Sequence, residues 1–488
     1  MSSVVQDISA DELCSFFASN FQPPVFSFPN IDHLPSQTLQ LNVEEVARHL
    51  SKLKRKSAGP DGLPYWVFRD CRFALAPAIT ILFNRCLMLC HVPTCLKVAN
   101  VSPIPKCDKP SQVNDFRPIS MLPLLSKLFE RIFSAKWLIP GIRDKLNCSQ
   151  FAYVPGSGKG TVMAVTSMYL HVLKYLDIDS GAVRIAAIDL SKAFDSITHD
   201  SIINACIRFN LSKDVTLWIK SYFSDRRQRV SLNGTYTEWK SVTSGVPQGS
   251  VIGPILFCLV VDSLKPLCDN SIFIKYADDL TILHFIRNDS DDNLQTEIDN
   301  VLQWCNDKSL SVNVTKSCVM DCVTKKSLSC RYVDSFKNVS CIKILGCFLS
   351  CDFKWNKHVE YVIKKASKRI YLMLSLKRAG CPPDLLFNVY VTCIWPILLY
   401  PFPAFCNIPQ YLKRRIISVE NRVFKIIGQS DDCPISLFAA ADQMCVTLFN
   451  KVVADSLHPL RRFFDERRVS HLRNTCPLKN PRQRHGAF

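Results

Sequence analysis

Two apolar stretches that carry aspartates constrain this fold more than any other feature of the sequence. RIAAIDL, at residues 184–190, is nearly all apolar and has Asp189 close to its end. YADD, at residues 276–279, lies between the apolar runs SIFIK and LTIL, so Asp278 and Asp279 are predicted at the tip of a hairpin. Three carboxylates at strand ends can hold two divalent ions about 3.5–4 Å apart, which clamp both oxygens in phosphoryl transfer.

Adjacent acids alone are weak evidence for such a site. Asp291-Asp292 and Asp431-Asp432 also occur, and we interpret these pairs as ordinary turn or surface acids. Asp189 or Asp279 taken singly would equally well cap a turn. The pair at 278–279 differs because apolar strands flank it, and like charges held together at a partly desolvated edge are costly without cations.

Composition indicates a large globular α+β protein with a polyanionic partner. The 488 residues are 48% hydrophobic and 21% charged, and helical and strand patterns mix without regular alternation. Lysine and arginine number 60 against 42 aspartates and glutamates, a net charge of +18. Such a charge favours binding to a phosphate backbone that weakens with salt, although an acidic membrane would attract it too.

Cysteine usage and apolar runs predict an intracellular protein rather than an exported or membrane-spanning one. None of the 23 cysteines forms a CxxC pair, and the first residues lack the apolar core of a signal peptide. Cys86, Cys90, His91 and Cys95 match no zinc finger spacing, so we interpret them as part of a buried helix. The longest apolar run, residues 389–405, contains three prolines and is predicted to be core.

The stretch PGSGKGT, residues 155–161, is similar to a phosphate-binding loop. The nucleoside-kinase form of that loop requires a first glycine where this chain has Tyr153, and a buried strand before it where this chain has NCSQFA. Both requirements fail. We therefore favour a glycine-rich bend and keep a nucleoside kinase as a disfavoured alternative.

Three blocks in order resemble motifs A, B and C of reverse transcriptases: AAIDLSKAFD (186–195), SGVPQGSVIGPILF (244–257) and KYADD (275–279). Further blocks narrow the resemblance to polymerases of non-LTR retrotransposons of the LINE, jockey or CR1 kind, over roughly residues 12–470. These further blocks are SAGPDGLP, ANVSPIPK with DFRPIS, SYFSDRRQRV, VNVTKS and ILGCFLS.

The resemblance implies a right-hand polymerase with fingers, an RNA-recognition-like palm and a helical thumb. It divides the chain into a loosely tethered leader (1–42), fingers (43–183), palm (184–350), thumb and C-terminal helices (351–470) and a basic tail (471–488). The implied activity is RNA-directed DNA polymerisation. RNA template, DNA primer or target, and dNTPs are the implied partners, together with the element's own RNA in a ribonucleoprotein of nucleus and cytoplasm.

The resemblance also assigns roles to single residues. Asp189, Asp278 and Asp279 correspond to the catalytic acids, which in the family hold two Mg²⁺ ions. Phe194 corresponds to the ring that excludes a 2′-hydroxyl, although it is also an ordinary core phenylalanine. Five further residues are implied to contact the nucleotide or its phosphates: Lys106, Arg117, Gln248, Gly249 and Lys316. Arg226, Arg227 and Arg229 are expected near the template, unless they form a solvated face.

Some modules of related elements are not expected in this sequence. Only some 42 residues precede the fingers, so we expect no upstream endonuclease, and no ribonuclease H module is recognised after the thumb. A catalytically idle remnant that binds RNA through its charge therefore stays open as an alternative to a polymerase.

Overall fold

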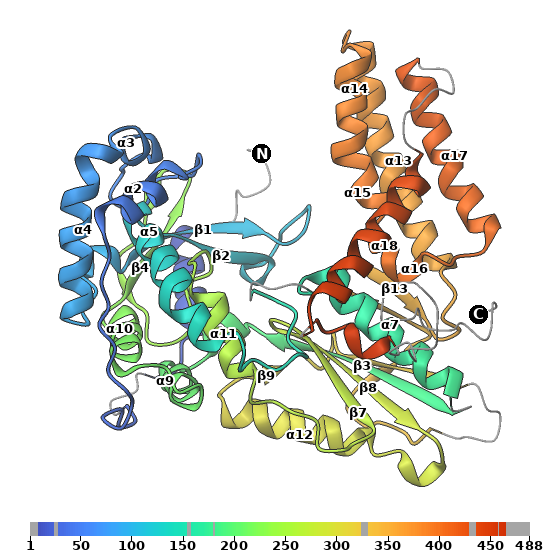
Figure 1. The fold of residues 1–488 in the computed structure, drawn as a ribbon, viewed down its shortest axis with the longest axis horizontal. Helices are drawn as coiled ribbons and strands as arrows, with labels where there is room; N and C mark the ends of the chain where they lie inside the picture. Colours follow the sequence, from blue (N-terminus) through green and yellow to red (C-terminus); the bar gives the residue numbers. More distant parts are fainter. Residues whose placement is uncertain are drawn as a thin grey trace, which may run out of the picture.

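The computed structural model describes residues 8–23, 28–153, 158–178, 181–323, 330–428, 436–456 and 458–464. A large sheet forms its centre, with a smaller sheet and helices on one side and a group of C-terminal helices on the other (Figure 1). The predicted α+β class is confirmed.

The large sheet has the strand order β11-β10-β3-β8-β7, with β9 paired to β3. Strand β8 lies between β3 and β7 and is antiparallel to both. The apolar patterns at 184–190 and 271–286 are therefore strands, as predicted. The bounds are β3 (Ala182–Ser191), β7 (Ser271–Tyr276), β8 (Asp279–Ile286), β9 (Ser311–Val312), β10 (Cys318–Val323) and β11 (Lys337–Asn338).

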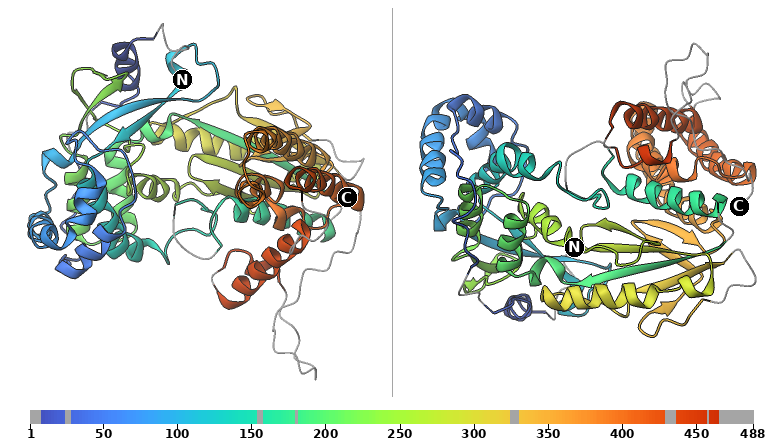
Figure 2. Two further views of the ribbon diagram at one scale, coloured as in Figure 1. Left: turned by 90° about the horizontal axis from the view of Figure 1, so that it is seen from above. Right: turned by 60° about the horizontal axis from the view of Figure 1, so that its bottom comes forward.

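Both faces of the large sheet are buried, which explains why β3 is apolar at almost every position. Ile188 and its even-numbered neighbours pack in one core with α9, α11 and α12, whereas Ile185 and Val183 pack in a second core with α7 and the C-terminal helices. Figure 2 shows α12 along one face of the sheet and α7 on the other. These helices span α7 (Thr161–Ile178), α8 (Ala193–Ser196), α9 (His199–Arg208), α10 (Lys213–Phe223), α11 (Gly253–Val261) and α12 (Leu294–Asp307).

The small sheet has the order β2-β1-β4-β5, with β6 also paired to β4. Its strand β4 comes from the middle of the chain and pairs in parallel with β1. This pairing brings residues 227–230 next to residues 98–101. Helices before and after the first two strands cover it. The bounds are α2 (Val43–Ser51), α3 (Tyr65–Asp70), α4 (Arg72–Met88), β1 (Val98–Pro105), β2 (Phe116–Met121), α5 (Leu124–Phe133), α6 (Ile139–Ile142), β4 (Arg227–Leu232), β5 (Thr235–Tyr236) and β6 (Lys240–Ser241).

The expectation of a loosely tethered leader is wrong for residues 10–22. Helix α1 (Ala10–Ala18) begins with a capping box at Ser9 and Glu12, and its Leu13 and Phe17 are buried against Val101 of β1. The following residue Gln22 donates its amide to Ser244 Oγ at 2.8 Å. The segment therefore belongs to the folded core around the small sheet.

The C-terminal helices follow a hairpin of β12 (Cys341–Ile344) and β13 (Cys347–Ser350). The helix predicted at 355–379 is α13 (Asn356–Arg378), whose Val359, Ala366 and Ile370 are buried as expected. The run at 389–405 is core as predicted, since Tyr390, Ile394 and Phe402 are buried. The remaining helices are α14 (Pro383–Val389), α15 (Trp395–Leu398), α16 (Phe402–Phe405), α17 (Gln410–Ile427) and α18 (Leu437–Ala454).

Among the described helices, α18 alone has the length and hydropathy of a membrane span. One such helix is weak evidence, because helices of soluble proteins pass the same test. The predicted basic tail at 471–488 lies outside the described residues.

The interpretation of Asp292 as a turn or surface acid is wrong. Its carboxylate is buried and accepts two hydrogen bonds from Arg184 Nη1, at 2.9 and 3.0 Å. Arg184 also donates to Asp321 at 2.8 Å, so a buried ion-pair network joins β3 to β10 and the segment before α12. Asp431 and Asp432 lie outside the described residues.

Candidate active site

The three predicted acids lie on neighbouring strands at one end of the large sheet. Asp189 on β3 and Asp279 on β8 are direct partners in the antiparallel register, so their side chains point to the same face. Asp278 comes directly before Asp279, in the tight turn that joins β7 to β8. The structure therefore brings together carboxylates that are about 90 residues apart in the sequence, as the sequence analysis expected.

The negative charges of these three acids repel one another. Burial first, and then the nearby Asp189 carboxylate, raise the pKa of Asp278 above its usual range. Burial and repulsion from Asp278 and Asp189 raise the pKa of Asp279 to about 6. Negative charge crowded in this way is stabilised by a cation, which is the electrostatic requirement of a divalent metal site.

Two side chains outside the motif's acids hold the turn in place. Ala277 occupies the left-handed region at φ 56°, an unfavourable conformation for an alanine. Its amide donates to Gln150 Oε1 at 3.2 Å, and Ala152 donates to the same oxygen at 3.0 Å. The buried Lys275 ammonium donates to the carbonyl of Val261 at 3.0 Å and to that of Leu264, so it caps the C-terminus of α11.

Cations from the small sheet face these acids. Lys106 follows β1 and Arg117 lies on β2, and the positive charge of Arg117 acts on Asp278. Burial, and repulsion from Lys316, Arg117 and Lys192 in that order, lower the pKa of Lys106. The repulsion among these side chains indicates that the cations lie near one another, where an anion such as a triphosphate would relieve it.

Lys316 lies beside the first acid. Its Nζ is 3.7 Å from Asp189 Oδ2, and its side chain is 70% exposed, so it can turn toward a ligand. The loop that carries it is fixed to β3, because the Asn313 amide donates to the Asp189 carbonyl at 2.7 Å and the Asp189 amide donates to Ser317 Oγ at 3.1 Å. The sequence prediction for Lys316 is compatible with this position.

Phe194 packs against the apolar cluster that includes Ala277 of the turn that carries Asp278, and its backbone is hydrogen-bonded to the loop that carries Gln248. The Phe194 ring contacts that of Phe257 with centroids 4.6 Å apart, and the ring is only partly buried. The Phe194 carbonyl accepts from the Val246 amide at 2.7 Å. Gly249, at φ 122°, allows this loop to approach β2, since a Cβ there would lie 2.7 Å from the carbonyl oxygen of Ser120.

The acids suit a cation that brings some of its own ligands. Among the described residues, no three His, Cys, Asp or Glu side chains converge closely enough to hold a metal ion by themselves. Mg²⁺ in such sites commonly uses one or two carboxylates together with water and substrate phosphates. Hard carboxylate oxygens crowded at a sheet end, opposite cations that would hold phosphates, fit this type of binding.

The lysine of the PGSGKGT stretch is engaged inside the protein. Residues 154–157 lie outside the described residues, but Lys159 donates to the Gln150 carbonyl at 2.5 Å and lies 5.5 Å from the Phe151 ring centre. Burial lowers the pKa of Lys159. These contacts do not suit the lysine of a phosphate-binding loop, which must reach the β- and γ-phosphates.

The expectation that Arg226 contacts the template is wrong. Its side chain is buried, donates to the Tyr222 carbonyl at 3.1 Å and lies over the Tyr222 ring. Arg229 is held between the rings of Tyr236 and Trp239. Arg227 is exposed.

Sequence reasoning missed several residues that shape the site. Gln150 and Lys275 were within quoted blocks but were given no role, and Asp195 follows Phe194 directly. The N-terminal helix was also missed: the Lys192 ammonium donates to Asn20 Oδ1 at 2.5 Å and lies 4.2 Å from the Phe16 ring centre. The only signal for Asp195 was its position inside motif A, because its partner is distant in the sequence.

Comparison with known protein families finds one model that matches half of the chain. The model described as "Reverse transcriptase (RNA-dependent DNA polymerase)" matches residues 104–349, which include all nine predicted site residues. Every strand of the large sheet falls within that range.

Among curated proteins, the "Probable RNA-directed DNA polymerase from transposon BS" of Drosophila melanogaster is 27% identical over 416 residues, covering 81% of this chain and 45% of that protein. The "RNA-directed DNA polymerase from mobile element jockey" of the same species is 24% identical, covering 74% and 41%. The chain thus spans less than half the length of these relatives.

Among solved structures, a telomerase from Candida tropicalis in complex with a TWJ fragment of telomeric RNA is 12% identical, with a TM-score of 0.39. The match covers 74% of this chain and 65% of that one.

Proposed function

We propose, from the premise that this chain belongs to the reverse transcriptase (RNA-dependent DNA polymerase) family, that it extends a DNA 3′-hydroxyl with dNTPs on an RNA template. Its homology to polymerases of non-LTR retrotransposons supports the same activity. The observation that carries the proposal is the meeting of Asp189, Asp278 and Asp279 with cations of the small sheet at one end of the large sheet. The small sheet with its helices, the large sheet and the C-terminal helices are the fingers, palm and thumb of a right-hand polymerase.

Residues of this chain would bind and orient the reactants. Lys106 and Arg117 would hold the triphosphate, since their repulsion is relieved by an anion. Lys316, beside Asp189, would reach the departing pyrophosphate and could give it a proton. Gln248 would touch the incoming nucleotide, with Gly249 allowing the close approach of its loop.

The three acids would hold two Mg²⁺ ions together with oxygens of the nucleotide. When bound, the ions supply charge neutralisation at the reacting phosphate and lower the pKa of the primer hydroxyl. The protein's part is to keep the carboxylates at one sheet end in a fixed turn, with Gln150 and Lys275 as its supports.

The proposed partners are an RNA template, a DNA primer or target, dNTPs and the element's own RNA. A net charge of +18 supports binding to a phosphate backbone. Binding to genomic DNA as its target and to the element's own RNA would place the protein in both nucleus and cytoplasm.

The proposal is tested with the purified chain, an RNA template with an annealed DNA primer, Mg²⁺ and labelled dNTPs. Templated extension supports it. RNA binding that fades with salt but never leads to extension would instead support an idle remnant. Transfer of phosphate to a free nucleoside would revive the kinase alternative.

Replacing Phe194 with valine should weaken the choice of deoxynucleotides over ribonucleotides by about tenfold or more, because removing the ring opens space for a 2′-hydroxyl. The ratio of kcat/KM for dNTP and rNTP measures the effect. Phe194→Tyr keeps the ring and is the matched control. Unchanged sugar discrimination in the valine variant would remove the role assigned to Phe194.

A further inference from the structure

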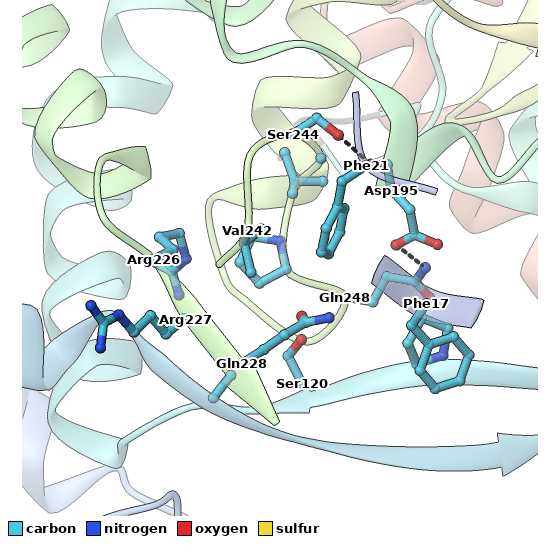
Figure 3. A pocket seen from close by; sticks show the side chains of 15 residues that line it. Phe17, Phe21, Ser120, Asp195, Arg226, Arg227, Gln228, Val242, Ser244 and Gln248 are labelled. Carbon is cyan, nitrogen blue, oxygen red and sulfur yellow. Dashed lines mark hydrogen bonds between the residues drawn. The ribbon is translucent and has the colours of Figure 1, made fainter. Parts of the chain in front are cut away.

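The side chain of Gln248 is held by an acid that has no assigned role. Gln248 Nε2 donates to Asp195 Oδ1 at 2.8 Å, and the two residues are 53 positions apart in the sequence. Figure 3 shows this pair at the wall of a pocket that Ser120, Phe17 and Phe21 also line. The contact therefore joins the short helix α8, which follows β3, to the loop before α11.

The backbone around this pair is fixed on both sides. The Asp195 carbonyl accepts from Ser244 Oγ at 2.9 Å, and the Val246 amide donates to the Phe194 carbonyl at 2.7 Å. The Gln248 carbonyl accepts from the Ser120 amide of β2 at 2.7 Å. Because both backbones are anchored, the Gln248 amide group can move only by rotation about its side-chain bonds. The hydrogen bond to Asp195 fixes that rotation.

A carboxylate can fix the orientation of the Gln248 amide. It accepts hydrogen bonds only, so the NH₂ group of the glutamine must face it and the Oε1 atom must face away. One N–H and the Oε1 atom of Gln248 are then left for another group. A neutral partner that both donates and accepts would allow either orientation of the amide.

The acid is costly to keep in this place. Burial raises the pKa of Asp195 to about 6, against the opposing effects of the Gln248 hydrogen bond and of the charges of Lys192 and Lys106. An acid whose folded pKa is raised destabilises the fold while it is ionised. That cost is present in full above about pH 6 and disappears as the pH falls toward its ordinary value of 3.8.

We propose that Asp195 is a positioning residue that orients the Gln248 amide for the incoming nucleotide. This inference rests on the proposed polymerase activity. Asp195 does not itself touch the reacting atoms in this account. It acts through Gln248, so its effect should be on nucleotide binding.

The test compares Asp195→Leu, which removes the acceptor but keeps a similar shape, with Asp195→Asn, which keeps an acceptor oxygen. In steady-state extension on an RNA template, the leucine variant should raise the KM for dNTP about tenfold with kcat within about threefold of wild type. The asparagine variant, whose side-chain amide both accepts and donates and so fixes the Gln248 orientation less well, should lie between wild type and the leucine variant. In a Gln248→Ala background, Asp195→Leu should add no further rise in KM.

Thermal unfolding separates this role from a merely structural one. The leucine variant should melt at or above the wild-type temperature at pH 7.5, with the advantage shrinking below pH 6, because the ionised acid has been removed. Asp200→Asn is the matched control, since Asp200 accepts from the amide of Asn204 at 2.8 Å on the exposed side of α9. Its KM for dNTP should not change.

An unchanged KM in the leucine variant, an asparagine variant as weak as leucine, or effects that add to those of Gln248→Ala would each overturn the inference. So would a melting temperature that falls in step with activity. A wild-type chain that extends no primer would instead overturn the proposed function, so the two failures are distinct.

Discussion

Asp278→Asn should reduce primer extension by about 10³-fold or more while leaving RNA binding intact. The substitution keeps the size of the side chain but removes a charged ligand from the end of the large sheet, where Asp189 and Asp279 lie beside it. Losing about 4 kcal/mol of transition-state stabilisation corresponds to that factor. Single-turnover extension rates and filter binding of labelled RNA measure the two quantities.

A matched control distinguishes this loss from a general effect of removing negative charge. Asp384→Asn alters an exposed acid on α14, within the C-terminal helices. Its extension rate should stay within about twofold of wild type, as surface substitutions usually do. An Asp278→Asn variant that still extends primers at a comparable rate would mean that the crowded acids are not catalytic.

Gly245→Ala should lower extension by about 10²-fold, because it moves the loop that carries Gln248. Gly245 lies in the left-handed region at φ 79°, and a Cβ there would be 2.6 Å from the carbonyl oxygen of Asp195. That oxygen belongs to the backbone and cannot rotate away, so the loop must shift. A displacement of about 1 Å near a reacting centre can cost such a factor.

Gly428→Ala is the control for the backbone conformation alone. Gly428 follows α17 at φ 85°, and no atom would lie within 4 Å of an added Cβ. This variant should lose roughly 1–2 kcal/mol of stability and keep its extension rate. Equal rates for the two alanine variants would show that the approach of Gly245 to Asp195 has no bearing on activity.

The strands and helices with strong patterns could be predicted from the sequence. The apolar run that ends near Asp189, the YADD hairpin and the helix at 356–378 follow from periodicity alone. The family resemblance assigned roles to nine residues, and the family match at residues 104–349 includes all nine positions, while their roles stay predictions. It did so because the motifs around these residues are local.

Pairings between distant residues could not be predicted. Asp292 was interpreted as a surface acid because its partner, Arg184, is 108 residues away in the sequence and no motif links the two. The helix at 10–18 was interpreted as part of a loose leader because its stability comes from packing against the small sheet rather than from its own length. Asp195 was overlooked for the same reason, since only the fold brings Gln248 to it.

The central claim is that Asp189 and the acids of the YADD turn share one divalent cation site. Fe²⁺ bound in place of Mg²⁺ reduces added hydrogen peroxide to hydroxide and a hydroxyl radical, and ascorbate returns the Fe³⁺ to Fe²⁺. The radicals cut the backbone next to the bound ion, and mass spectrometry locates the cuts. With primer, RNA template and a dNTP bound, we predict cuts both near residue 189 and near residues 277–279, suppressed by excess Mg²⁺. Cuts at only one of these places, or at neither, would contradict the account.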